Sequence, residues 1–275
     1  MTDFFRAMFG TPQGVVGSFI VALAFLAVVF GPHLATFDPE QIAAYARYEA
    51  PGLEHFLGTD QFGRDILSRL LVGARSTVLL STIATLIGTL LGAGIGTTAA
   101  FLGGRVDEVV MRTLDAIMAI PTLLLALLIA DLLGRNTVNT VLAIGIAFTP
   151  GMTRITRSIA LSIRNQEFVQ AAIARGESRA YIIFREMLPN ALAPIIIEAT
   201  IRVSFAIMLF ATLSFLGLGA QPPASEWGLM VAEARRYMHL SIWMILWPSV
   251  AIALVAIGFN LLGDGLRDAV NTRLR

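Results

Sequence analysis

The chain has 275 residues, of which 56% are hydrophobic and 14% charged, and its mean hydropathy is +0.75. A chain with so few polar groups cannot cover its apolar surface as a water-soluble domain does, so the composition indicates a membrane protein in contact with lipid. The net charge of +1 is uninformative, but no basic stripe with interleaved aromatic residues is present, and no nucleic-acid partner is expected.

Two residue types are absent, and their absence excludes several chemistries. The sequence has no cysteine, so a disulfide framework, a thiol nucleophile and a cysteine-based metal site are excluded. It also has no lysine, and therefore neither a P-loop nor a Schiff-base lysine. We expect no cofactor in this chain, and any ATP and Mg²⁺ would be bound by other subunits.

Six stretches are apolar and long enough to span a membrane as helices of about 20 residues. They cover residues 15–34, 77–101, 109–133, 138–155, 191–216 and 241–262. The first lacks a small-residue cleavage site directly after a short apolar core, which indicates an uncleaved anchor. The sequence thus predicts an all-α integral membrane protein with a single transmembrane domain over residues 1–275.

The distribution of arginine predicts the orientation of these spans. Twelve arginines lie near the termini or in the segments on their side, seven lie on the other side, and Arg202 lies within a span. Because cytoplasmic loops carry the excess of positive charge, both termini and segment 156–190 are predicted to be cytoplasmic. Segments 35–76 and 217–240 are then extracytoplasmic.

The second and third spans contain residues typical of packing or gating. Gly88, Gly92 and Gly96 follow each other at intervals of four, so they form one small-residue face on which another helix backbone can approach closely. This face suits static packing, and it also suits a sliding surface in a gating helix. Pro121 is expected to kink the third span, either at a gate or simply to improve packing.

Two pairs of opposite charges lie within the predicted span limits. Arg112 and Asp115 are three residues apart, and Glu198 and Arg202 are four apart in the favoured acid-first order. Charges at membrane depth are costly and usually face a polar interior, so they could line a translocation path. Each pair also falls within about two turns of its span start, where the side chains could neutralise each other or snorkel, and this second interpretation is favoured.

A polar stretch of about twenty residues, 166–189, stands out between the fourth and fifth spans. It predicts a first short helix over residues 166–175 that presents Ala171, Ala172 and Ala174, ended by Gly176 in a left-handed conformation. Ser178 can N-cap a second helix, which Pro189 is expected to end at residue 188. A short helix with a small-residue face outside the membrane suits insertion into a groove of a partner.

Enzyme signatures are missing. The three histidines are scattered, and no HExxH or GxSxG motif occurs, so a zinc or serine hydrolase is not expected. Asp115 and Asp131 lack the matching motif of an aspartyl intramembrane protease. A stand-alone ion-coupled transporter would show inverted repeats, which are not evident. An intramembrane hydrolase and an ion-coupled transporter remain the alternatives from other classes.

The polar stretch resembles the EAA loop of ATP-binding cassette importer permeases. In that family a Glu-Ala-Ala triplet precedes a glycine and a later Leu-Pro, and here Ala171, Ala172, Gly176, Leu188 and Pro189 match in spacing. Gln170 stands where the triplet has Glu. Residues 55–65 (HFLGTDQFGRD), 214–228 (with SFLGLG and EWG) and 260–268 (NLLGDGLRD) resemble the C-type permease of the dipeptide, oligopeptide and nickel importers.

This resemblance implies a six-helix type I permease in the bacterial inner membrane, surrounded by lipid. Its partners would be a homologous B-type permease, two ATPase subunits and an extracytoplasmic solute-binding protein. The expected solute is a di- or oligopeptide, with a nickel chelate, glutathione, an opine or an oligosaccharide as alternatives. The chain itself would not be an enzyme.

The resemblance also implies roles for individual residues. Contact with the ATPase is expected of Gln170, Ala171, Ala172, Arg175, Gly176, Arg179, Arg185, Leu188 and Pro189. Docking of the binding protein is expected of Gly58, Thr59, Asp60, Gly63, Arg64, Asp65, Glu226 and Trp227. The turn leads into an amphipathic piece with Ile66, Leu67, Leu70 and Leu71 on one face, which is expected to lie at the outer membrane interface or to support the pore mouth.

Overall fold

The computed structural model describes residues 8–272, with side chains to residue 270, and the fold over this range is all-helical. The helices are α2 (Pro12–Leu34), α3 (Ile66–Ala74), η1 (Arg75–Leu79), α4 (Leu80–Leu102), α5 (Gly104–Met118), α6 (Thr122–Leu133), α7 (Thr137–Arg164), α8 (Glu167–Ala174), α9 (Arg179–Tyr181), η2 (Ile182–Met187), α10 (Leu188–Phe215), α11 (Trp227–Ala234), η3 (Arg235–Tyr237) and α12 (Trp243–Thr272). Strand pairing in the described range is limited to one isolated bridge between Thr59 and Asp65.

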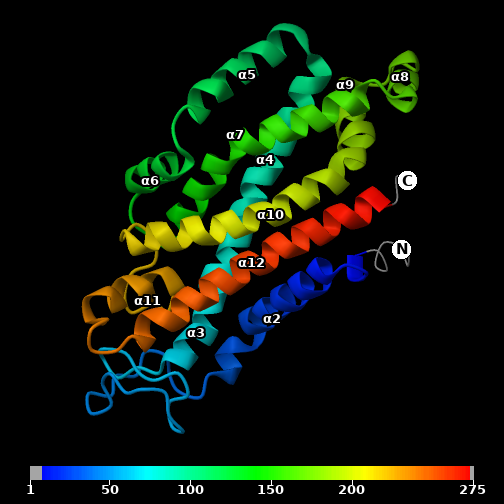
Figure 1. Ribbon diagram of the computed structural model, residues 1–275. Helices are drawn as coiled ribbons and strands as arrows, with labels where there is room; N and C mark the ends of the chain where they lie inside the picture. The colour runs from blue at the N-terminus through cyan, green and yellow to red at the C-terminus, as the bar shows by residue number, and fades with distance from the viewer. Residues whose placement is uncertain (1–7, 273–275) are drawn as a thin grey trace.

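The long helices lie alongside one another and give the molecule two distinct ends (Figure 1). Helix α4 packs mainly against α7, while α12 packs against α2 and α10. Helix α8, the start of α2 and the end of α12 lie toward one end, at the upper right of Figure 1. Helix α11 and the segment that joins α2 to α3 lie at the opposite end, at the lower left. The chain therefore presents two separate surfaces outside its apolar middle.

Four helical stretches are long and apolar enough to cross a membrane. They are Pro12–Leu34, Ile66–Leu102, Arg179–Phe215 and Trp243–Val270, and the bent pair α5–α6 makes up to five. Helix α7 covers the predicted fourth span, but it does not belong to this group. Threonines along its length, such as Thr149 and Thr153, and three arginines in its second half dilute its apolar residues.

The predicted third span is divided into two helices. Helices α5 and α6 meet at an angle of 88° across a break of a few residues, instead of forming one kinked helix. Pro121 occupies the N-cap of α6 with an extended ψ of 134°. Its ring fixes φ, and it disfavours helical geometry at the preceding residue, so the helix ends before it and a new one starts after it.

The predicted end of the second short helix at residue 188 is wrong. Helical structure continues from Arg179 through η2 into α10, and Pro189 lies in the first turn of α10. The segment η2 is π-helical, and the Leu188 N–H donates to the Ile183 carbonyl oxygen, five residues back. A wider helical turn before Pro189 accommodates the missing N–H without ending the helix.

Candidate functional site

Helix α8 is held by one buried face on the end of α7 and on η2, which continues into α10. Val169 and Ala172 are buried in the same apolar cluster as Met187 of η2. Gln170 lies on the exposed side, and of the three predicted alanines Ala171 and Ala174 are exposed while Ala172 is buried. The short helix is thus fixed to its own chain while its other face remains free.

The predicted end of α8 is present in detail. Gly176 has a φ of +76°, and the Glu177 N–H donates to the Ala172 carbonyl oxygen at 3.2 Å, which is the pattern of a Schellman cap. The Ser178 hydroxyl then accepts from the Tyr181 N–H at 3.2 Å and caps the following helix. These two caps define the angle at which α8 leaves the helix that follows.

The exposed surface around α8 carries both acidic and basic side chains and is partly apolar. Arg175 lies 3.6 Å from Glu177 and 3.7 Å from Glu186, whereas no ion pair is recorded for Arg179 or Arg185 within residues 8–270. Large apolar side chains are exposed nearby, namely Ile173, Tyr181 and Phe184. Leu188 is half-buried and Pro189 exposed. Exposed apolar groups rimmed by charge are typical of a protein-binding surface.

Gln170 has a contact that the sequence did not predict. Its side-chain amide nitrogen Nε2 donates to the Arg164 carbonyl oxygen at 3.0 Å. Arg164 is the last residue of α7, where backbone carbonyls have no partner within the helix. The amide of Gln170 therefore ties α8 to the end of α7.

The three glycines of the second span line the seam between α4 and α7. A Cβ on Gly88 would lie 2.7 Å from the Gly145 carbonyl oxygen, and one on Gly92 would lie 2.8 Å from the Thr153 nitrogen. A Cβ on Gly96 would lie 2.9 Å from the Arg157 nitrogen. Because atoms other than hydrogen would clash at these distances, only glycine allows the two backbones to approach so closely.

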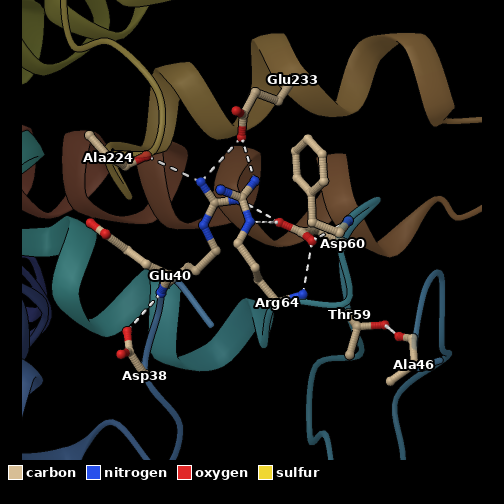
Figure 2. Close-up of polar contacts among 10 residues, drawn as sticks. Asp38, Glu40, Ala46, Thr59, Asp60, Arg64, Ala224 and Glu233 are labelled. Carbon is tan, nitrogen blue, oxygen red and sulfur yellow. Dashed lines mark hydrogen bonds and ion pairs between the residues drawn. The ribbon is translucent and has the colours of Figure 1, made fainter. Parts of the chain in front are cut away.

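The predicted docking residues of the outer turn are largely buried. Asp60 accepts from Arg64 Nε at 2.6 Å and from Arg69 Nη1 at 2.7 Å, and Arg64 Nη2 lies 3.0 Å from Glu233 Oε2 (Figure 2). Arg69 Nη2 also reaches Glu233 Oε2 at 3.2 Å and the Ala224 carbonyl oxygen at 3.1 Å. Two arginines and two acids thus balance one another inside the end that is predicted to be the outer one. We call these four residues the outer ion cluster (Asp60, Arg64, Arg69 and Glu233).

The rest of the turn is satisfied within the chain. Gly58 and Gly63 have φ values of +83° and +76°, which an L side chain rarely adopts. Thr59 accepts from the Glu49 N–H at 2.9 Å and donates to the Ala46 carbonyl oxygen (Figure 2). Asp65 caps α3 by accepting from the Ser68 N–H at 2.7 Å, and it pairs with His55 Nδ1 at 2.9 Å. The turn is therefore a folded support for the outer surface.

Glu226 and Trp227 fasten α11 to the junction of α3 and α4. The Glu226 carboxylate accepts from the Gly228 and Leu229 N–H groups at 2.9 and 2.7 Å and from the Thr77 hydroxyl at 3.2 Å. The Trp227 ring nitrogen donates to the Leu70 carbonyl oxygen at 2.9 Å. Glu226 is 0% exposed, and its burial raises the pKa of its carboxyl, although the two backbone N–H groups act in the opposite direction.

Sequence reasoning missed Arg69, Thr77 and Glu233. Helix α3 was expected to lie at the outer membrane interface or to support the pore mouth, because Ile66, Leu67, Leu70 and Leu71 share a face. In the structure Ile66 and Arg69 are both nearly fully buried, and α3 continues through η1 into α4. An arginine on the polar face of such a short apolar helix was the available signal. Its acidic partners lie 9 and 164 residues away in sequence, so no local pattern identifies the second of them.

Within the part of the chain that the structure describes, no group of three or more His, Asp or Glu side chains could hold a metal ion.

Comparison with known proteins identifies the family. Residues 84–275 match the family described as "Binding-protein-dependent transport system inner membrane component". The probable D,D-dipeptide transport system permease protein DdpC of Escherichia coli K12 is 41% identical over 264 residues, which are 96% of this chain and 89% of the relative. The dipeptide transport system permease protein DppC of Alkalihalophilus pseudofirmus is 38% identical over 271 residues, 98% and 89% of the two chains.

A relative that is named for a different substrate is nearly as similar. The glutathione transport system permease protein GsiD of Pectobacterium atrosepticum is 36% identical over 274 residues, which are 99% of this chain and 91% of the relative. The family match covers more than half of the chain, and the relatives align over almost its whole length. The chain is therefore a multi-pass membrane permease that belongs to the family of binding-protein-dependent transport system inner membrane components, as the resemblance in its sequence predicted.

Proposed function

We propose that this chain forms half of the translocation pore of an ATP-driven importer for di- or oligopeptides. The observation that carries the proposal is the position of two unlike surfaces at opposite ends of one helical bundle. At one end the short helix α8 exposes Gln170 and Ala171, and at the other end α11 and the outer turn form a compact cap (Figure 1). An importer needs both surfaces, because it receives solute on one side and energy on the other.

The proposed topology has six spans. Helix α7 is the fourth, in addition to the four apolar helices and the bent pair α5–α6. Both termini and α8 are cytoplasmic, and residues 35–65 and 217–240 are extracytoplasmic. The excess of arginine on the side of α8 supports this orientation. The proposed membrane is the bacterial inner membrane that the family description names.

The proposed coupling element is α8 together with the helical stretch from Arg179 onward. Each of two partner ATPases binds ATP and Mg²⁺, and one of them receives the exposed face of α8 in a surface groove. Arg179 and Arg185 lack acidic partners among the described side chains and are available to carboxylates of the ATPase. Because α8 is fastened to both α7 and α10, its displacement moves these two helices.

The outer surface is proposed to receive the solute-binding protein. The buried cluster and the Glu226 contacts keep this surface rigid, and exposed residues around them make the contact itself. A homologous B-type permease completes the pore. The proposed substrate class is taken from the names of the relatives. Two of these names concern dipeptides and one concerns glutathione, itself a peptide derivative.

Reconstitution tests the proposal. The complete complex in proteoliposomes should take up a radiolabelled dipeptide only with internal ATP and loaded binding protein. The substitution Ala171→Arg places a long cation on the exposed face of α8, and we expect it to abolish co-purification of the ATPase. The matched substitution Ala50→Arg lies on the exposed outer segment and should leave co-purification intact.

Three results would contradict the proposal. They are equal co-purification in both variants, uptake that persists when the Walker lysines of the ATPases are replaced, and hydrolysis of the peptide by this chain alone. The second result would favour an ion-coupled transporter, and the third an intramembrane hydrolase.

A further inference from the structure

A cavity of about 530 Å³ lies between the break that separates α5 from α6, helix α7 and helix α10. Its walls are mostly apolar and include Ile120, Phe148 and Phe205. The charged groups that line it are Glu198 and Arg202, both from α10. Cavities of this size hold small organic ligands, and such sites combine apolar walls with a few placed polar groups.

The arginine extends across the cavity from one helix to the other. Arg202 Nε lies 3.1 Å from Glu198 Oε1, and the two side chains are 21% and 22% exposed. The guanidinium carbon lies 5.9 Å from the centre of the Phe148 ring on α7. A Cβ on Gly151 would lie 3.1 Å from Arg202 Nη2, so glycine at this position of α7 leaves room for the guanidinium.

The pair lies near the middle of its helix and not at an end. Arg202 is 14 residues after Leu188 and 13 before Phe215, the two ends of α10 (202 − 188 and 215 − 202). At 1.5 Å per residue it stands roughly 20 Å from either end. Helix α10 begins earlier than the predicted span, so Glu198 and Arg202 lie 10 and 14 residues after its first residue and not within two turns of it.

The other pair does not share this environment. Arg112 pairs with Glu108 at 2.6 Å, and Asp115 pairs with Arg154 of α7, all with exposed side chains. Only the pair on α10 faces a cavity enclosed by three elements. A charge within a membrane-spanning helix is costly in hydrocarbon and is expected to face a polar or water-filled path.

We infer that Glu198 and Arg202 form a solute-contact site in this half of the pore, which takes the carboxylate and ammonium groups of a zwitterionic peptide. This inference rests on the proposed function as an importer. The peptide carboxylate pairs with the Arg202 guanidinium, and its ammonium group pairs with Glu198. Exchange of partners keeps the number of paired charges constant, so a solute with two opposite charges passes without leaving an isolated charge in the apolar zone.

The first test measures whether the cavity holds water and attracts anions. Because the chain has no cysteine, Met208→Cys introduces a unique thiol in the cavity wall, and Leu254→Cys introduces one on an exposed position of α12 that lies outside this cavity. In the complete complex, methanethiosulfonate reagents should modify Met208→Cys and leave Leu254→Cys largely unmodified. Adding Arg202→Gln should lower the labelling rate of an anionic reagent several-fold relative to that of a cationic reagent. Adding Glu198→Gln should raise the same ratio of rates.

The second test measures transport. Arg202→Gln should lower ATP-driven uptake of a labelled dipeptide on the order of tenfold. This loss corresponds to the removal of one hydrogen bond to a charged group. Stimulation of the ATPase by loaded binding protein should remain, and Arg202→Lys should restore part of the uptake. Uptake at the wild-type level in Arg202→Gln would overturn the inference, as would an equal loss of uptake and ATPase stimulation in both variants.

The two tests separate this inference from the function on which it rests. If the unaltered complex takes up no dipeptide, the proposed function fails, and the labelling ratios still report whether the cavity is wet and charged. If uptake occurs but Met208→Cys is no more reactive than Leu254→Cys, the function stands and the solute-contact site is wrong.

Discussion

Gln170 occupies the position where the EAA motif that this loop resembles has Glu, and its contact gives the amide a role that a carboxylate cannot fill. The amide donates to the Arg164 carbonyl oxygen, whereas an ionised carboxylate has no proton to donate. A carboxylate would also stand near the C-terminus of α7, where the helix dipole is negative. The residue at this position therefore determines how firmly α8 is held to α7.

We predict that Gln170→Glu loosens the junction between α7 and α8. Amide hydrogen exchange at residues 165–170 should accelerate roughly fivefold, which corresponds to a lost hydrogen bond of about 1 kcal/mol. Gln166→Glu is the control, because Gln166 makes no side-chain capping bond and the change adds the same charge. Equal exchange in the two variants would show that the Gln170 bond is unimportant.

The second residue-scale prediction concerns Glu226 and pH. Its folded pKa lies above the ordinary value of 4.5 because of burial, so the folded state binds a proton more tightly than the unfolded state does. Stability from this group is complete below the unfolded pKa and is lost as pH rises through the folded pKa. As pH rises above 4.5, the ordinary pKa of the carboxyl, the thermal midpoint of the complex should fall more than that of Glu226→Gln.

A companion variant separates charge from hydrogen bonding. Glu226→Ala leaves two backbone N–H groups and the Thr77 hydroxyl without their acceptor, which should destabilise the outer end by roughly 2 kcal/mol or more. Glu226→Gln retains an acceptor oxygen and should remain close to the unaltered protein at neutral pH. A thermal scan in which the Gln and Ala variants lose equal stability would contradict this account.

At the scale of elements, the seam between α4 and α7 depends on glycine at particular positions. Gly92→Ala would place a Cβ 2.8 Å from the Thr153 nitrogen, so the two helices must separate and lose contacts along their length. Gly94 lies two residues further on α4, and nothing lies within 4 Å of its added Cβ. We predict that Gly92→Ala lowers the thermal midpoint and uptake, and that Gly94→Ala changes neither.

This comparison also tests which role the seam has. If α4 and α7 slide during transport, Gly92→Ala should reduce uptake more than it reduces thermal stability. If the seam is static, uptake should fall only in proportion to the amount of folded complex. A Gly94→Ala protein as impaired as Gly92→Ala would indicate that helix propensity, and not close packing, explains the effect.

At the scale of the whole molecule, hydrophobic runs predicted most of the long helices, because 20 apolar residues leave the backbone few alternatives in lipid. The angle between α5 and α6 was not predictable. Pro121 indicates that the helix breaks, but the direction in which α6 continues depends on where Ala126 and Ala130 pack. The outer ion cluster could not be predicted from the sequence either, because Asp60 and Glu233 come together only in the folded chain. Buried partners far apart in sequence leave no local pattern.

The proposed topology gives a prediction at the same scale. Leu53→Cys and Ser178→Cys lie on exposed positions at opposite ends of the bundle, and Leu53 is 96% exposed. A membrane-impermeant maleimide should label Leu53→Cys in intact cells and spare Ser178→Cys, and the pattern should reverse in inside-out vesicles. The opposite pattern would invert the proposed orientation.

The outer ion cluster has a consequence for biosynthesis. Arg64 and Arg69 emerge from the ribosome 169 and 164 residues before Glu233, their shared partner. At about 5–20 residues per second, they wait roughly 10–30 s with only Asp60 to balance two positive charges. The first half of the nascent chain cannot complete this cluster until α11 arrives, so in the proposed topology the last extracytoplasmic loop completes the fold that the first one begins.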